Sequence, residues 1–300
     1  MAQTATTGNL ENAQKIIIAT SRYTEEHNAP AMNLIEQFSL PNGNKTVTVP
    51  KVGQMSMSDL ADGIDIVDEE DIGMTTVDLT ASEVGAKIII TDKLSRQSAE
   101  NVFSIIGRQL GDGMARKKDE DVVALYSGFG TDIGAAGRSM TLANVAASIA
   151  YAKGNKFGSQ VYINHHPFAV FDVANTAVTA STTYPVPQGW TADLLGNFFS
   201  GLRPINGVPI FEDGNITIDA SDDAVGVIAD KTALAVLKSV DTRTERQRDA
   251  SLRATEVVIT ADYGVFELDD SKGAAFTLDA GTPASNVKAA PLLSSSSNTP

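Results

Sequence analysis

The longest helical pattern in the chain runs from Ser98 to Tyr126. At 100° per residue its first apolar side chains fall within about one third of the helix circumference; they are Val102, Phe103, Ile106, Leu110 and Met114. The charged run 116–121 interrupts this face, and apolar residues then resume on a rotated face. Such a helix would be about 43 Å long at ~1.5 Å per residue, too long and too polar in its middle for one compact core. The pattern therefore predicts a spine across the molecule; the alternative is two helices broken at Gly111–Gly113.

Shorter patterns predict the remaining elements. Helical spacing favours helices over 9–26, 31–38, 141–153, 165–172 and 231–240. Alternating or β-branched runs favour strands over 45–52, 74–80, 84–91, 160–164, 208–211, 216–218, 224–229, 256–260 and 264–268. Because Pro50 cannot donate to a sheet ladder, we expect the strand over 45–52 at a sheet edge or in a free ribbon.

An acidic stretch separates two of these strands. Its acids recur mostly every third residue, which suits neither a pleated strand nor a persistent helix face; they are Asp59, Asp62, Asp65, Asp68, Glu69, Glu70 and Asp71. We interpret the stretch as an extended loop held away from the core between strand arms near 45–52 and 83–91. Calcium would suit such oxygen ligands, but the spacing and terminal Glu of an EF-hand are missing. A solvated or salt-bridged loop is the simpler interpretation.

Composition narrows the function classes. The chain has 300 residues, enough for one large domain or two ordinary ones. It has no cysteine, which excludes disulfides, thiolate metal sites and a cysteine nucleophile. Its formal net charge of −14 argues against a nucleic-acid binder, which relies on clustered Lys and Arg. No apolar run is long enough to span a bilayer, and the N-terminus lacks the pattern of a signal peptide.

The sequence shows no recognisable catalytic, cofactor or metal motif. Paired catalytic acids, a Ser/His/Asp arrangement, an HExxH, a P-loop and a zinc cluster are all missing from the pattern. The glycines of 128–134 have GxGxxxG spacing and follow a helix, so a dinucleotide loop is not expected. His165 and His166 point to different faces of an expected helix start, without a third ligand at suitable spacing. We therefore expect a structural protein without catalytic, cofactor-binding or metal residues.

The order of the elements, together with two phrases, resembles the tailed-bacteriophage major capsid protein of the Hong Kong 97 type. The phrases are EVGAKIIITDKLSRQSAENVFSIIGRQLGDGMARKKDEDVVALYSG at 83–128 and INGVPIFED at 205–213. The resemblance implies an α+β fold. It further implies an N-terminal arm over 1–40, an extended E-loop with its strand arms over 41–94, the spine helix of a peripheral domain over 95–134, an axial domain over 135–225, return strands and a helix completing both domains over 226–280, and a mobile tail over 281–300.

The resemblance also implies a function. Such a protein self-assembles as pentamers and hexamers into an icosahedral head shell around double-stranded DNA, without sequence-specific binding. Its expected partners are copies of itself, a portal, and scaffolding and decoration proteins, with scaffolding either separate from this chain or unnecessary and no membrane involved. Its expected location is the virion, after assembly in the cytoplasm of the bacterial host. The alternatives are an encapsulin-type nanocompartment shell protein and an α/β small-molecule enzyme.

Charge and apolar patterns predict where subunits touch. We expect the seven acids of the loop to meet basic residues of a neighbouring subunit; the candidates are Arg116, Lys117 and Lys118 on the spine, and Arg243, Arg246, Arg248 and Arg253 before the last strands. We expect the apolar run Ile16, Ile17 and Ile18 in the N-terminal arm to dock on a neighbour as well. Several partly screened ion pairs of this kind set the choice of partner and its register.

Overall fold

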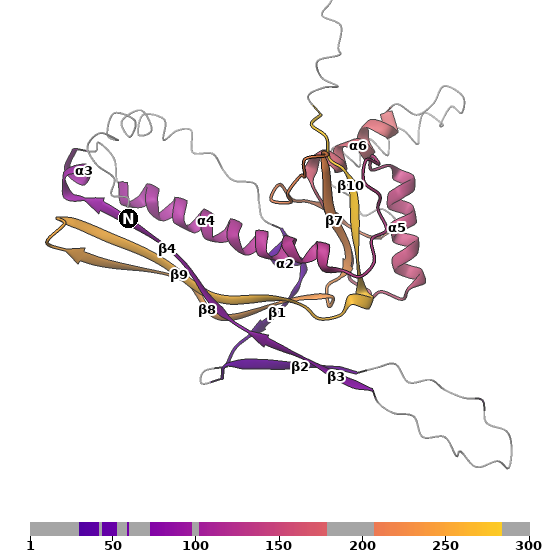
Figure 1. Ribbon diagram of the computed structural model, residues 1–300, viewed down its shortest axis with the longest axis horizontal. Coiled ribbons are helices and arrows are strands. Elements are labelled where there is room, and N and C mark those ends of the chain that lie inside the picture. Colours follow the sequence, from indigo (N-terminus) through magenta and orange to yellow (C-terminus); the bar gives the residue numbers. More distant parts are fainter. Residues whose placement is uncertain are drawn as a thin grey trace, which may run out of the picture.

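The computed structural model describes residues 30–41, 44–52, 59, 73–97, 102–178 and 207–283, without the side chains of 102–105 and 174–178. Several sequence predictions lie outside these residues: the helix over 9–26, the tail from 284, and six of the seven loop acids. The described chain forms a long sheet with a helix along it, a second sheet flanked by helices, and a ribbon that projects from the molecule (Figure 1).

The bounds of the elements are as follows. The helices are α2 (Ala31–Leu34), α3 (Asp92–Gln97), α4 (Val102–Ala124), α5 (Leu142–Gly154) and α6 (Pro167–Val178), with 3₁₀ turns η3 (Leu125–Gly128) and η4 (Asp270–Lys272). The strands are β1 (Glu36–Ser39), β2 (Thr46–Val52), β3 (Met74–Thr80), β4 (Ser82–Thr91), β5 (Val161–His165), β6 (Ile210–Glu212), β7 (Asp223–Asp230), β8 (Leu234–Asp249), β9 (Ala254–Glu267) and β10 (Gly273–Asp279). In the part of the chain that the structure describes, no helix combines the length and apolar character needed to cross a membrane.

The first sheet has the strand order β1-β8-β9-β4, and α4 lies along it (Figure 1). α4 is continuous through Gly111–Gly113, so the predicted spine is confirmed and the two-helix alternative is wrong. A Cβ at Gly107, Gly111 or Gly113 would meet nothing within 4 Å. These glycines are therefore not required by close packing within the subunit.

Two sequence predictions fail in this sheet. The segment predicted as a helix over 231–240 is mostly the buried first part of β8, because Leu234–Leu237 lie between β1 and β9 with no exposed surface. The two strands predicted over 256–260 and 264–268 form a single strand, β9, paired with β8 along its length. In both cases pairing across the sheet overrides the local signal.

The N-terminal part of the described chain also differs from expectation. The helix predicted over 31–38 ends at Leu34, and the chain continues as β1, which pairs in parallel with β8 from Glu36↔Ala235. Ile35, which lies between α2 and β1, has no exposed surface. A short apolar run is ambiguous between helix and strand, and here the open edge of β8 decides for a strand.

The second sheet has the order β10-β7-β5-β6 and is flanked by α5 and α6 (Figure 1). Thr141 caps α5 by accepting a hydrogen bond from the backbone N–H of Asn144 at 3.2 Å. His165, at the end of β5, is fully buried, and its Nε2 lies 2.9 Å from the carbonyl oxygen of Phe276 on β10. To reach β10 the imidazole crosses β7 at Gly226, where a Cβ would lie 2.2 Å from its Cδ2 atom. Gly226 therefore creates the space for the imidazole.

The glycine loop of 128–134 serves packing. A Cβ on Gly134 would lie 2.1 Å from the carbonyl oxygen of Thr277, because the loop passes directly against β10. Asp132 fixes this approach by accepting from the Thr277 hydroxyl at 2.5 Å. The Gly130 N–H donates to the Asp270 carboxylate at 2.7 Å. The loop's polar groups are thus directed at its own chain.

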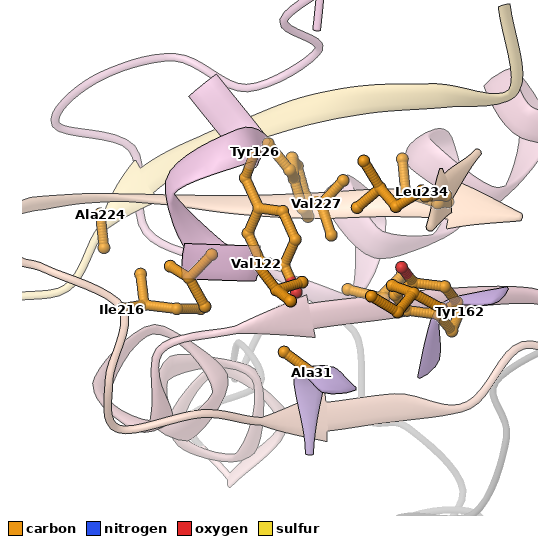
Figure 2. Close-up of a cluster of buried hydrophobic side chains, with 14 of the residues drawn as sticks. Ala31, Val122, Tyr126, Tyr162, Ile216, Ala224, Val227 and Leu234 are labelled. Carbon is orange, nitrogen blue, oxygen red and sulfur yellow. The ribbon is translucent and has the colours of Figure 1, made fainter. Parts of the chain in front are cut away.

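The two sheets share one hydrophobic core, which lies where the end of the spine meets the second sheet. Figure 2 shows Val122 and Tyr126 of the spine among side chains that include Ile216 and Val227, with Ala31 of α2 beside them. These five residues have at most 3% of their surface exposed. The core therefore joins the spine, the N-terminal segment and the second sheet into one unit.

Candidate intersubunit surfaces

The ribbon of β2 and β3 projects from the rest of the described chain (Figure 1). The strands pair antiparallel from Thr46↔Thr80 to Val52↔Met74, with Pro50 inside the ribbon, as its sequence predicts. The second strand arm was predicted near 83–91, but that segment belongs to β4 and pairs with β9. At the distal end Val52 and Met74 are 58% and 63% exposed and lie opposite each other. They form an apolar pair that the described part of this subunit does not cover.

The ribbon is anchored at two points. At its proximal end Leu79 is fully buried, and a Cβ on Gly264 of β9 would lie 2.2 Å from the carbonyl oxygen of Thr80. Farther out, the Lys51 ammonium lies 2.5 Å from Asp269, just beyond β9. Asp59 is exposed, and the other six loop acids lie outside the described residues. The ribbon thus holds the start of the acidic stretch away from the core.

The predicted arginines gather on the outer hairpin of β8 and β9. Side-chain alternation along β8 places Arg246 and Arg248 on one face and Arg243 on the other. Arg248 already forms a two-point ion pair with Asp92 at 2.5 and 2.7 Å, which lowers the pKa of that carboxyl. Arg253 has a positive φ of 47° in the turn that closes the hairpin. The four arginines therefore share a region but do not form one uniform patch.

The basic run on the spine is engaged within the subunit. Arg116 and Lys117 pair with acids one turn ahead, at 3.8 Å from Glu120 and 2.5 Å from Asp121. Lys118 reaches across to β8, where its ammonium lies 2.8 Å from the Thr242 hydroxyl. The ammonium also lies 5.5 Å from the centre of the Tyr263 ring. These contacts hold the spine on the first sheet. They also bring the basic residues 116–118 close to Thr242, where the hairpin of β8 and β9 leaves the core.

Sequence reasoning missed a buried polar network at the end of the spine. Asp119 has no exposed surface, although it lies in the charged run. It accepts hydrogen bonds from the Ala31 N–H at 2.9 Å and from the Asn215 side chain at 2.9 Å. Helical spacing could have revealed it, since Asp119 precedes the buried Val122 and Tyr126 by three and seven residues.

The second carboxyl of this network is Asp213, also without exposed surface. It accepts from the backbone N–H of Asn215 at 2.9 Å and lies 3.4 Å from the amide nitrogen of Asn164. Burial, followed by a hydrogen bond with Asp213, raises the pKa of Asp119 to about 7. Two adjacent buried carboxyls disfavour double ionisation. In the described residues, no group of three or more His, Asp or Glu is placed to hold a metal ion.

Comparison with known proteins identifies the fold. No family model matches the sequence, and no curated protein matches it. Among solved structures, the mature capsid of bacteriophage PhiM1 aligns with a TM-score of 0.65 at 15% identity, over 85% of this chain and 89% of its own. The acidic stable capsid of Helicobacter pylori bacteriophage KHP30 aligns with a TM-score of 0.66 at 12% identity, over 84% and 89%.

A chain from Mycobacterium phage Adephagia aligns over an even larger share. It covers 94% of this chain and 100% of its own, with a TM-score of 0.65 at 12% identity. The alignments therefore span the sheets and the spine together, rather than one shared motif. This chain has the α+β capsid fold of tailed bacteriophages, the Hong Kong 97 type, as the order of elements in its sequence predicts.

Proposed function

We propose that this protein is the major capsid protein of a tailed bacteriophage, which assembles as pentamers and hexamers into an icosahedral shell around double-stranded DNA. The observation that carries the proposal is the agreement of fold with capsid chains over most of both lengths. The encapsulin alternative shares the fold, but the neighbours described above are phage structures and do not favour it.

The shape of the subunit supports assembly. The exposed pair Val52 and Met74 lies at the end of a ribbon with no core of its own, and the outer half of β8 is exposed over 240–248. Interfaces between obligate subunits commonly bury ~2,000–5,000 Å². An interface of that size would order segments that a single subunit leaves uncovered.

We further propose a structural, non-enzymatic role in the virion. The proposed partners are copies of the chain, a portal, and scaffolding and decoration proteins, with assembly in the host cytoplasm. The net charge of −14 supports a container for DNA, because a strongly basic lining would bind and immobilise the genome.

Expression of the protein alone tests the assembly proposal. We expect closed polyhedral particles or capsomers in negative-stain micrographs, and light scattering well above the 31.6 kDa of one chain. A stable globular monomer across micromolar concentrations would refute a shell role. Packaged nucleic acid would support a capsid, whereas a co-purified enzyme cargo would support an encapsulin.

The acidic loop is proposed to dock on basic residues of a neighbouring subunit, and Ile16–Ile18 on a neighbour as well. Arg246 is a suitable single test, because it lies in the exposed outer half of β8. We expect Arg246→Glu to reduce the particle yield severalfold at low salt, where electrostatic attraction is least screened. Lys231→Glu, the same charge change in the turn between β7 and β8, is the control and should assemble normally.

Complementary reversal identifies the partner. Asp65→Lys with Asp68→Lys should also reduce the yield, and combining these with Arg246→Glu should restore part of it if the residues meet across an interface. Particle yield is measured by sedimentation. Normal assembly of the loop variant at low salt would show that the acidic loop is not a docking element.

A further inference from the structure

The buried network at the end of the spine joins elements from both sheets. Asp119 lies on α4, along the first sheet, whereas Asp213 directly follows β6 of the second sheet. Asn215 bridges them, donating through its side chain to Asp119 and through its backbone N–H to Asp213, both at 2.9 Å. The Ala31 N–H adds the start of α2 at 2.9 Å. A change in the protonation of these two carboxyls would therefore affect α4, the start of α2 and the segment after β6 together.

Among the residues that the structure describes, the groups facing the pair supply no positive charge. They are the Tyr126 hydroxyl on η3, the Asn164 amide on β5, the Asn215 amide and the Ala31 N–H. None of the ion pairs among the described residues includes Asp119 or Asp213. Burial raises the pKa of Tyr126 far above its usual range, so its hydroxyl stays neutral. Without a cation, ionising both buried carboxyls is costly.

We propose that Asp119 and Asp213 share one proton at neutral pH and so form a pH-dependent clasp between the two sheets, which loosens when that proton is lost. A pKa of about 7 for Asp119 agrees with this arrangement. Above it, the two carboxylates repel each other, and the hydrogen bonds through Asn215 and Ala31 no longer offset the repulsion. The clasp concerns the folded subunit and goes beyond the shell function.

The replacement Asp213→Asn tests the clasp in the unassembled, full-length protein. The Asn side-chain oxygen can still accept from the Asn215 N–H, while its amide donates to Asp119 without needing a shared proton. Because folded Asp119 has a raised pKa, the folded protein loses stability as the pH rises from about 4 to 7. Since burial alone also raises the pKa of Asp119, Asp213→Asn keeps part of this pH effect, and we expect the melting temperature of the wild type, relative to Asp213→Asn, to fall by about 2 °C between pH 5 and 7.

Hydrogen exchange gives the local readout. After correction for intrinsic rates, peptides covering 30–40 and 210–218 should lose protection above pH 7 in the wild type but not in Asp213→Asn. Glu120→Gln, which removes an exposed carboxyl beside Asp119, is the control and should follow the wild type. Should Asp213→Asn fail to fold, Asp119→Asn removes the same proton and should show the same loss of pH dependence. Equal pH profiles for the wild type and a folded Asn variant would overturn the proposal.

Discussion

Gly226→Ala is expected to destabilise the protein by about 3 kcal/mol. The added Cβ would lie 2.2 Å from Cδ2 of His165 and 2.7 Å from the backbone oxygen of Asn164. The oxygen belongs to the neighbouring strand β5 and cannot move alone, while the imidazole is buried against β10. Overpacking at such a site costs typically 1–3 kcal/mol, at the upper end when backbone is involved. Denaturant unfolding of the unassembled protein measures the loss.

Gly113→Ala is the matched control, with an effect of opposite sign. The same methyl group on the spine would meet nothing within 4 Å. Replacing a helical glycine by alanine should therefore stabilise the protein by roughly 0.5–1 kcal/mol. If Gly226→Ala proved as stable as the wild type, the crossing of β7 by the His165 side chain would be wrong.

We expect the wild type to lose about 3 kcal/mol of folding stability on acidification because of His165, and His165→Gln should remove this loss. His165 is fully buried, and burial lowers its pKa from 6.5 to about 4. A lowered pKa of a base means that its contribution to stability is present above pH 6.5 and is lost as the pH falls toward 4. At ~1.4 kcal/mol per pKa unit, the expected loss over this window is about 3 kcal/mol.

The glutamine amide can keep a donor toward the Phe276 carbonyl without titrating. It leaves the His166 N–H without the Nδ1 acceptor of His165, now at 2.9 Å, which should cost about 1–3 kcal/mol at pH 7. Between pH 7 and 4 the stability difference should then change by about 3 kcal/mol in favour of His165→Gln, so that the wild type loses its advantage in urea titrations. A gap that is constant with pH would mean that His165 does not stay neutral in the folded protein.

The two pH effects oppose each other in the wild type. Between pH 4 and 6.5, protonation of unfolded His165 disfavours folding on acidification, while the proton held by Asp119 and Asp213 favours it. The wild-type stability should therefore change little over this range. In His165→Gln and in Asp119→Asn, each of which lacks one of the two titrating groups, the free energy of unfolding should change steeply with pH.

The sequence contained the large-scale layout but not the contacts that complete it. Periodicity was sufficient for the spine, because a long helix has many residues that repeat one pattern. It was sufficient for β2 too, where Pro50 predicted an edge strand or a free ribbon rather than a central strand. It failed for Leu234–Leu237, since a run with helix-favouring Ala and Leu becomes a strand only when β1 and β9 flank it.

The candidate surfaces were predictable only as groups of charges. The sequence brings the four arginines close together, but their distribution over two faces of β8 depends on its register with β9. The ion pair between Arg248 and Asp92 joins residues 156 positions apart, a separation that no local pattern records. Asp119 was hidden for a similar reason, because its partners Ala31 and Asn215 come from distant parts of the chain.

The irregular pairing of β8 with β9 marks a place where the sheet can bend. Pairing with β9 shifts between Lys238 and Val240 and again between Val240 and Arg243, just where the pairing with β1 ends at Ser39. On one side Leu234–Leu237 are buried in the core; on the other the hairpin extends away from the second sheet, with β4 paired to β9 and α4 lying along it (Figure 1). β-bulges bend and twist a strand locally. The segment 238–243 is therefore the place where the hairpin of β8 and β9 can bend relative to the core. A bend there would redirect the outer part of the hairpin, and β4 paired with it, without repacking Leu234–Leu237.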